Sequence, residues 1–191
     1  MVIGILALQG AFGRHARLLN RLGVRSAQVR DAAELAGCDG LIIPGGESTA
    51  MSRLLTANGL LEPLQAFARE HPVMGTCAGL ILMAEQVDDP RITPLALLPV
   101  RVERNHYGSQ LDSFETTLSL RLSDEKAQPP FTGVFIRAPA IVSLGPELKV
   151  IAEHERRPVM VAGGRHLGLS FHPELTDDTR IHRYWLERFY A

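Results

Sequence analysis

The sequence has 191 residues, a length that suits one domain with a substantial buried core. Hydrophobic residues make up 46% and charged residues 21%, which is a globular composition and not that of a disordered chain. The formal net charge is −1, so no excess of positive charge draws the protein toward nucleic acid or an anionic membrane. The sequence shows no basic leader and no apolar stretch near the roughly 18 residues of a membrane span. We therefore expect a single domain, residues 1–191, in the cytosol.

The first half of the chain alternates strand and helix signals. Short apolar runs predict strands at residues 2–8, 24–30, 40–43 and 72–76. Apolar residues at helical spacing predict helices at about 12–22, 32–36, from 48 onward and at 60–69. Ser48 or Thr49 is expected to cap the third of these helices. Strands separated by helices in this way are typical of βαβ units and a mainly parallel sheet.

The second half of the chain has a different residue pattern. Between residues 88 and 151, prolines and two-residue alternation, as in 114–120, predict antiparallel strands and long loops. A closing helix is expected at about 179–190. The predicted fold class is α/β, with three layers, a mainly parallel central sheet covered by helices on both faces, and an antiparallel extension.

Cys77 lies in Gly75-Thr76-Cys77-Ala78-Gly79, between a strand signal and a helix-like run. This G-x-C-x-G pattern is a version of the nucleophile elbow, in which a sharp strand-to-helix turn presents a reactive side chain. The glycines let the backbone turn tightly, and a helix N-terminus favours a thiolate over a thiol. A lone cysteine in an apolar segment is more often a small buried hydrophobe, so the catalytic interpretation depends on the elbow.

Near the other end, the strand-like run 167–171 leads into His172-Pro173-Glu174. Side chains at i and i+2 of an extended segment point the same way, and Pro173 restricts His172 to extended geometry. We expect His172 to shuttle a proton for Cys77 and Glu174 to hold the imidazole in the useful tautomer. The alternative is a plain strand terminus with a solvated carboxylate.

Four predicted strands end in turns that fit one site, at residues 9–10, 44–48, 75–77 and 172–174. Ligands of an open parallel sheet bind outside the carboxyl ends of its strands, so neighbouring strands would bring these turns to one edge. There Cys77 would attack a carbonyl carbon, and the N–H groups of Ala78 and Gly46 would stabilise the oxyanion. The sequence therefore predicts a cysteine-dependent acyl-transfer enzyme, although the Pro-Gly-Gly at 44–46 also fits a plain tight turn.

Other candidate sites are weaker. With two cysteines, no C-x-x-C pair and no H-E-x-x-H spacing, the sequence predicts neither a disulfide framework nor a metal site. We expect no metal or other cofactor, and we expect Cys38, next to Asp39, only to pack. Arg104 and Arg137 are candidates for gripping a substrate carboxylate, although arginines are more often solvated.

Several sequence blocks together carry a family resemblance: 4–10, 41–49, 75–80, 102–105, 112–115, 131–139 and 170–175. With its elbow cysteine and His-x-Glu, the chain resembles the class I, or triad, glutamine amidotransferases, which have a flavodoxin-like fold. Along its whole length it is similar to the glutaminase subunits of pyridoxal 5′-phosphate synthase. Pro-Gly-Gly-Glu-Ser-Thr at 44–49, Glu-Arg-Asn at 103–105 and Phe-Ile-Arg-Ala-Pro at 135–139 separate this branch from other triad amidotransferases.

The resemblance implies a role for each matching residue. Cys77 is the nucleophile, and His172 and Glu174 complete the relay. The implied L-glutamine-binding residues are Gly46, Glu47, Ser48, Arg104, Ile136 and Arg137. The implied oxyanion-hole residues are Ala78, Gly46, Gln9 and Gly10.

The resemblance also implies a partner. Such a subunit hydrolyses L-glutamine and passes the ammonia to a barrel-shaped synthase subunit in a large hetero-oligomer, where pyridoxal 5′-phosphate is built. Gln9 and Gly10 are implied to face that partner and to complete the oxyanion hole on docking. Tyr107 and Ser109 stand where the family usually has phenylalanine and arginine, which bears on partner affinity. Independently, the chain shows no site of its own that would use the ammonia, so a partner is expected.

Two alternatives remain at this point. The first is the glutaminase subunit of another triad amidotransferase, such as imidazole glycerol phosphate synthase, against which the blocks at 103–105 and 135–139 speak. The second is a non-catalytic regulatory subunit on the same fold. Retention of all three triad residue types argues against it.

Overall fold

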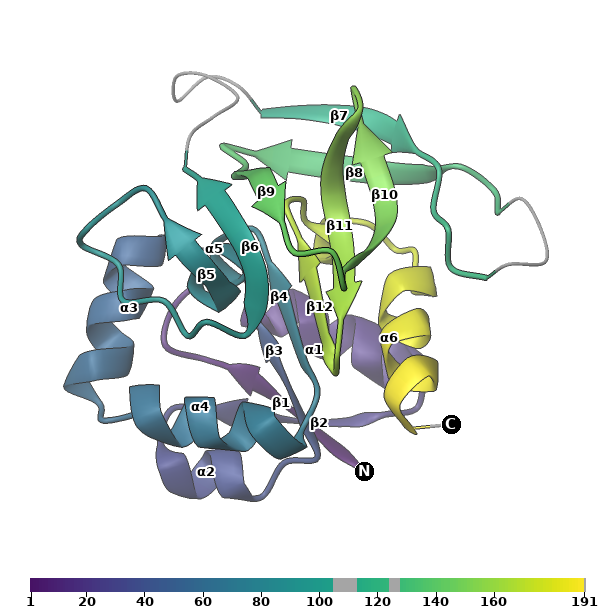
Figure 1. Cartoon of the computed structure of the whole chain (residues 1–191). Helices are drawn as coiled ribbons and strands as arrows, with labels where there is room; N and C mark the ends of the chain where they lie inside the picture. Colours follow the sequence, from purple (N-terminus) through teal and green to yellow (C-terminus); the bar gives the residue numbers. More distant parts are fainter. Residues whose placement is uncertain (105–112, 124–127, 191) are drawn as a thin grey trace.

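A computed structural model describes residues 1–104, 113–123 and 128–190 of the chain (Figure 1). Within these residues, seven strands form a central sheet in the order β10-β11-β12-β4-β3-β1-β2. Their bounds are β1 Val2–Leu6, β2 Arg25–Val29, β3 Gly40–Ile43, β4 Val73–Thr76, β10 Lys149–His154, β11 Arg157–Gly163 and β12 His166–Leu169. The strands from β12 to β2 run parallel, whereas β10, β11 and β12 pair antiparallel. The mainly parallel sheet with an antiparallel extension is confirmed.

The helices cover both faces of this sheet. Their bounds are α1 Phe12–Arg21, α2 Ala32–Ala36, α3 Ser48–Ala57, α4 Leu61–Glu70, α5 Ala78–Met83 and α6 Arg180–Tyr190. Buried side chains of α2, α3, α4 and α5 pack on one face, and those of α1 and α6 pack on the other. None of the helices within the described residues combines the length and the apolar character that crossing a membrane requires.

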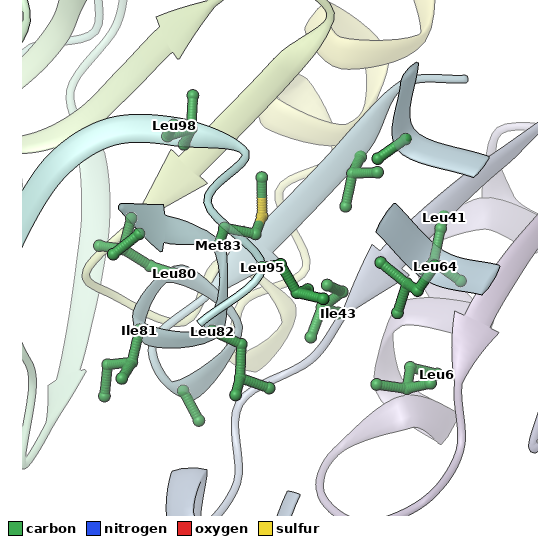
Figure 2. Packing of buried hydrophobic residues seen from close by; sticks show 14 of the residues in the cluster. Leu6, Leu41, Ile43, Leu64, Leu80, Ile81, Leu82, Met83, Leu95 and Leu98 are labelled. Atoms are coloured by element: carbon green, nitrogen blue, oxygen red, sulfur yellow. The ribbon is translucent and has the colours of Figure 1, made fainter. Parts of the chain in front are cut away.

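Buried side chains of the central strands alternate between these two faces. On β3, Leu41 and Ile43 belong to the first cluster, whereas Ile42 belongs to the second. Figure 2 shows part of the first cluster, which includes Leu64 of α4 and Leu41 of β3. Each such fully buried side chain contributes about 1.5–3 kcal/mol to folding. Because both faces are covered, the parallel strands read as continuous apolar runs in the sequence.

Two smaller sheets extend the fold. One is formed by β5 Ala84–Val87, β6 Leu98–Glu103 and β9 Ala140–Leu144, and the other by β7 Ser113–Leu118 and β8 Phe131–Ile136. The β6–β9 and β7–β8 pairs are antiparallel, as predicted. The β5–β6 pair is parallel, and β5 lies before residue 88, where the predicted antiparallel region begins. Residues 88–97 connect these two parallel strands.

Candidate active site

Cys77 lies at a sharp turn between β4 and α5. It is the N-cap residue of α5, with φ 50° and ψ −104°, a backbone conformation that is uncommon outside glycine. A Cβ at Gly79 would lie 2.0 Å from the carbonyl oxygen of Ile43, so this turn packs against β3 only because residue 79 has no side chain. The geometry is that of the elbow predicted from the sequence.

His172 approaches Cys77 from the segment that follows β12. Its backbone N–H donates to the carbonyl oxygen of Val134 in β8 at 2.9 Å, which ties the segment to the smaller sheet. The ring Nδ1 lies 2.7 Å from Oε1 of Glu174. The Cys77 thiol raises the pKa of the same ring, and Nε2 is the ring nitrogen left to face it. The Cys77 Sγ also lies 3.8 Å from the carbonyl oxygen of Ile136. One imidazole therefore joins the sulfur to the carboxylate.

The path of the chain between His172 and Glu174 differs from the prediction. Pro173–Leu175 form a single turn of 3-10 helix, so the expected extended alignment of positions 172 and 174 is wrong. Proline readily begins a helical turn because its φ is already set. His172 itself has a φ of −107° and a ψ of 88°, outside the α region that the following proline disfavours. The turn brings the carboxylate back beneath the ring.

The charges in this cluster follow from burial and contacts. Burial alone lowers the pKa of His172, but its hydrogen bonds with Cys77 and Glu174 outweigh this and raise the pKa to about 10. Burial also disfavours the ionised form of Glu174, but the neighbouring His15 and His172 hold the pKa of this carboxyl below its usual range. At neutral pH the ring is protonated, so a positive charge lies beside the Cys77 sulfur.

Two hollows open in front of the sulfur. The first, of about 60 Å³, is lined by Gly46, Glu47, Ser48, Cys77, Ala78, Ile81, Arg104, Ile136 and Arg137. The second, of about 320 Å³, is lined by Gln9, Gly10, Ala11, Gly45, Gly46, Glu47, Cys77, Ile136, Arg137, His172 and Leu175. All six residues predicted to bind glutamine line the first hollow, and Gln9 and Gly10 line the second. Turns that are far apart in the sequence thus meet at the carboxyl edge of the parallel strands.

The turn at Gln9 and Gly10 is bound to the glycine turn that follows β3. Oε1 of Gln9 accepts a hydrogen bond from the N–H of Glu47 at 2.8 Å. The N–H of Ala11 donates to the carbonyl oxygen of Gly45 at 3.3 Å. These contacts bring the predicted oxyanion-hole residues of both turns to the edge of the hollow that contains Cys77. Ala78, the fourth of them, is in the first turn of α5, where backbone N–H groups lack helical partners.

Glu47 caps helix α3, and the expectation that Ser48 or Thr49 would do so is wrong. Its carboxylate accepts hydrogen bonds from the N–H groups of Thr49 at 3.0 Å and Ala50 at 2.7 Å. The helix begins at Ser48, one residue earlier than a serine cap would require, so the cap position falls to residue 47. A carboxylate at this position satisfies two N–H groups that have no helical partner and opposes the positive end of the helix dipole.

Arg104 spans the side of the first hollow. Its guanidinium forms an ion pair with Asp89 and lies 3.4 Å from Glu47. Hydrogen bonds from Arg91, together with the charge of Arg104, hold the pKa of Asp89 far below its usual range. Asp89 thus fixes the guanidinium at the pocket. Asp89 was not predicted from the sequence, because an acidic residue in a polar loop carries no signal of its partner 15 positions away.

Two buried histidines near the triad were not predicted from the sequence either. His15 on α1 and His182 on α6 are fully buried, and Nε2 of His15 lies 3.5 Å from Oε2 of Glu174. His15 occupies a position on the apolar face of its helix, where a histidine reads as a core residue. The only signal of His15 in the sequence is that a titratable side chain occupies the apolar face of a predicted helix.

The remaining candidates are simpler. Cys38 is buried, as expected, and its Sγ donates to the carbonyl oxygen of Glu34 at 3.3 Å. Arg137 lines both hollows, with a φ of 45°. Tyr107 and Ser109 lie outside the described residues.

Comparisons with known proteins identify the family of the chain. Residues 5–191 match the model of the SNO glutamine amidotransferase family. A relative from Desulforudis audaxviator, "Pyridoxal 5'-phosphate synthase subunit PdxT", is 46% identical over 187 residues, which cover 97% of each chain. A relative of the same name from Geobacillus thermodenitrificans is 47% identical, covering 97% of this chain and 94% of its own.

Solved structures give the same result. One described as a glutamine amidotransferase superposes with a TM-score of 0.90 at 41% identity, covering 98% of both chains. A chain of PurLQS from Thermotoga maritima superposes with a TM-score of 0.69 at 14% identity, covering 98% of this chain and 97% of that one, which shows a shared fold. By sequence, fold and family match, the chain belongs to the SNO glutamine amidotransferase family.

Proposed function

We propose that this chain hydrolyses L-glutamine to L-glutamate and ammonia, and that the ammonia serves the synthesis of pyridoxal 5′-phosphate by a partner subunit. The observation that carries the proposal is the ring of His172, which contacts both the Cys77 sulfur and Glu174 at the head of a nucleophile elbow. Full-length relatives named as subunits of pyridoxal 5′-phosphate synthase support the pathway. On this proposal, residues 1–191 work as one glutaminase domain.

The chemistry runs through the three side chains of the triad. The Cys77 thiolate attacks the side-chain amide carbon of glutamine, and a tetrahedral oxyanion forms. His172 gives its proton to the amide nitrogen, and ammonia leaves as the thioester forms. Water then attacks the thioester with His172 as base, which releases glutamate and restores the thiolate–imidazolium pair. Glu174 holds the ring in position through both steps.

The hollows suggest how the substrate binds. Arg104 and Arg137 are cations that suit the α-carboxylate of glutamine, and Glu47 is an anion that suits its α-ammonium group. Ser48, Gly46 and Ile136 complete the wall beside the sulfur. The oxyanion is assigned to the N–H groups of Ala78 and Gly46, with the Gln9–Gly10 turn completing this site when the partner docks.

The partner is proposed to be the synthase subunit, barrel-shaped and assembled with this chain in a large hetero-oligomer. Ammonia released next to Gln9 and Gly10 would pass directly into that subunit, because this turn lines the open hollow. A cytosolic location belongs to the same proposal and fits the two free cysteines, Cys38 and Cys77.

The test is ammonia release from L-glutamine by the purified chain, with and without the pyridoxal 5′-phosphate synthase subunit of the same organism. We expect little release from the chain alone and a rise in kcat on adding the subunit, with a smaller change in KM. Cys77→Ala serves as the blank and should release no ammonia above background. Absence of release in the presence of the subunit would contradict the function, and full activity without it would contradict activation by docking.

A further inference from the structure

Behind the triad lies a chain of buried polar side chains that the proposed hydrolysis does not use. Nδ1 of His15 lies 2.9 Å from Nε2 of His182, and both rings are fully buried. On the opposite side of His15, Nε2 lies 3.5 Å from Oε2 of Glu174. Two imidazoles, one from α1 and one from α6, therefore continue the triad away from the substrate pocket.

The proton positions on the His15 and His182 rings can be assigned from the surroundings of these rings. Burial lowers the pKa of His15 in spite of the nearby Glu174, and burial together with His15 lowers the pKa of His182 to about 3. Both rings are therefore neutral at pH 7. A bare Nε2 on His15 would turn a lone pair toward a carboxylate, so we assign its proton to Nε2.

The proton positions on the other ring nitrogens of His15 and His182 follow from this tautomer. Nδ1 of His15 accepts from Nε2–H of His182, and Nδ1 of His182 carries no proton. That last nitrogen has no hydrogen-bond partner within the part of the chain that is described. The opposite tautomers would leave a buried N–H without an acceptor, which is rarer and more costly than an unpaired acceptor.

Glu174 needs a second donor. Oε1 accepts from His172, whereas Oε2 is buried and makes no hydrogen bond with any described residue. An unpaired carboxylate oxygen in the interior is costly and favours protonation. The titratable and charged groups around this carboxylate are His15, His182, His172, Arg14, Arg17 and Asp177, and Cys77 interacts with His172. Of these groups, the Nε2–H of His15 is the donor that faces Oε2 of Glu174. The Oγ1 of Thr76 also lies 3.5 Å from Nε2 of His15.

We propose that His15 is a positioning residue of the glutaminase site, which offers Nε2–H to Oε2 of Glu174 while His182 holds that tautomer. The other carboxylate oxygen then stays on Nδ1 of His172. His15 touches neither substrate nor sulfur, so it acts only through Glu174. The inference rests on the proposed function, because the ring it orients is the proposed acid and base.

The first test is kinetic and uses the complex with the synthase subunit. His15→Leu removes the donor and keeps much of the volume, His15→Gln keeps an N–H donor, and Leu19→Ala creates a buried defect on the same helix. We expect His15→Leu to lower kcat about tenfold, the effect of one lost hydrogen bond to a charged group, with KM for glutamine unchanged. The loss should be greater at pH 6 than at pH 9, because Glu174 binds a proton more readily without the donor. His15→Gln should restore most of kcat, and Leu19→Ala should leave the pH profile unchanged.

The second test does not depend on glutamine. Alkylation of Cys77 by iodoacetamide is followed by peptide mass spectrometry in the intact chain, with Cys38 as an internal reference. We expect His15→Leu to slow labelling of Cys77 about tenfold at pH 7 while Cys38 is unaffected. Equal labelling and equal pH profiles in the parent and His15→Leu would overturn the proposal, and so would equal losses in all three variants. A parent that labels at Cys77 but releases no ammonia in the complex would overturn the proposed function instead.

Discussion

The two cysteines of this chain differ in their surroundings and hardly at all in burial. Both are free thiols, and their exposed fractions are 5% for Cys38 and 6% for Cys77. Cys38 follows a short helix, where burial and the charges of Asp39 and Glu34 raise the pKa of its thiol. Cys77 faces the protonated ring of His172 and opens onto two hollows.

The contrast shows what separates a structural cysteine from a candidate nucleophile. Anions around a buried sulfur keep it protonated and inert, whereas a cation stabilises its ionised form. The backbone contributes as well, because the positive φ at Cys77 points the side chain out of the sheet edge toward the pocket. Accessible surface alone would not distinguish the two residues.

The largest predicted effect comes from removing the cation. His172→Asn keeps a polar side chain but has no group that carries a proton at neutral pH. Ammonia release from the complex should fall by about 10³-fold or more, and iodoacetamide should then label the two cysteines at similar rates. Circular dichroism and the urea midpoint check that the fold is kept. A variant with more than a tenth of the parent activity would remove His172 from the mechanism.

A smaller effect is expected from moving the ring without removing it. A Cβ at Gly45 would lie 2.3 Å from Cε1 of His172, so Gly45→Ala must displace the imidazole. We expect kcat to fall about 10- to 100-fold, because catalysis depends on the placement of the proton carrier. Labelling of Cys77 should fall to a value between that of the parent and that of Cys38.

Gly13→Ala is the matched control for this change. The same methyl group meets no atom within 4 Å there, since Gly13 lies on an open side of α1. It should leave both readouts unchanged. Equal activity of Gly45→Ala and Gly13→Ala would contradict the placement of His172 against the glycine turn.

The smallest predicted effect is a pH dependence of the labelling of Cys77 relative to Cys38. Because the pKa of His172 is raised from 6.5 to about 10, its charge is present at pH 7 and lost as the pH rises through 10. As that charge is lost, the Cys77 sulfur loses the cation beside it, so the ratio of Cys77 to Cys38 labelling should fall about tenfold. The stability that this protonated ring contributes is full below pH 6.5 and is lost through the same range. A labelling ratio and a urea midpoint that both stay constant from pH 7 to pH 10.5 would contradict the raised pKa.

Much of the site could be predicted because it depends on short-range rules. The glycines around Cys77 determine the elbow locally, and a proline after His172 restricts the backbone that delivers it. Apolar runs separated by helical patterns are enough to predict a parallel sheet, and a parallel sheet brings the ends of its strands to one edge. These signals are contained within a few consecutive residues, so a single sequence carries them.

Only the tertiary structure decided which polar groups stand behind and beside the triad. His15 and His182 are 167 positions apart and meet because α1 and α6 pack on the same face of the sheet. Asp89 holds Arg104 across a loop, and Glu47 became a helix cap once the helix began at Ser48. Such contacts depend on how helices and strands pack together, and packing cannot be predicted from any one segment of the sequence. The sequence by itself determined the candidate nucleophile and its turn, whereas packing determined the partners that set the charge and orientation of its neighbours.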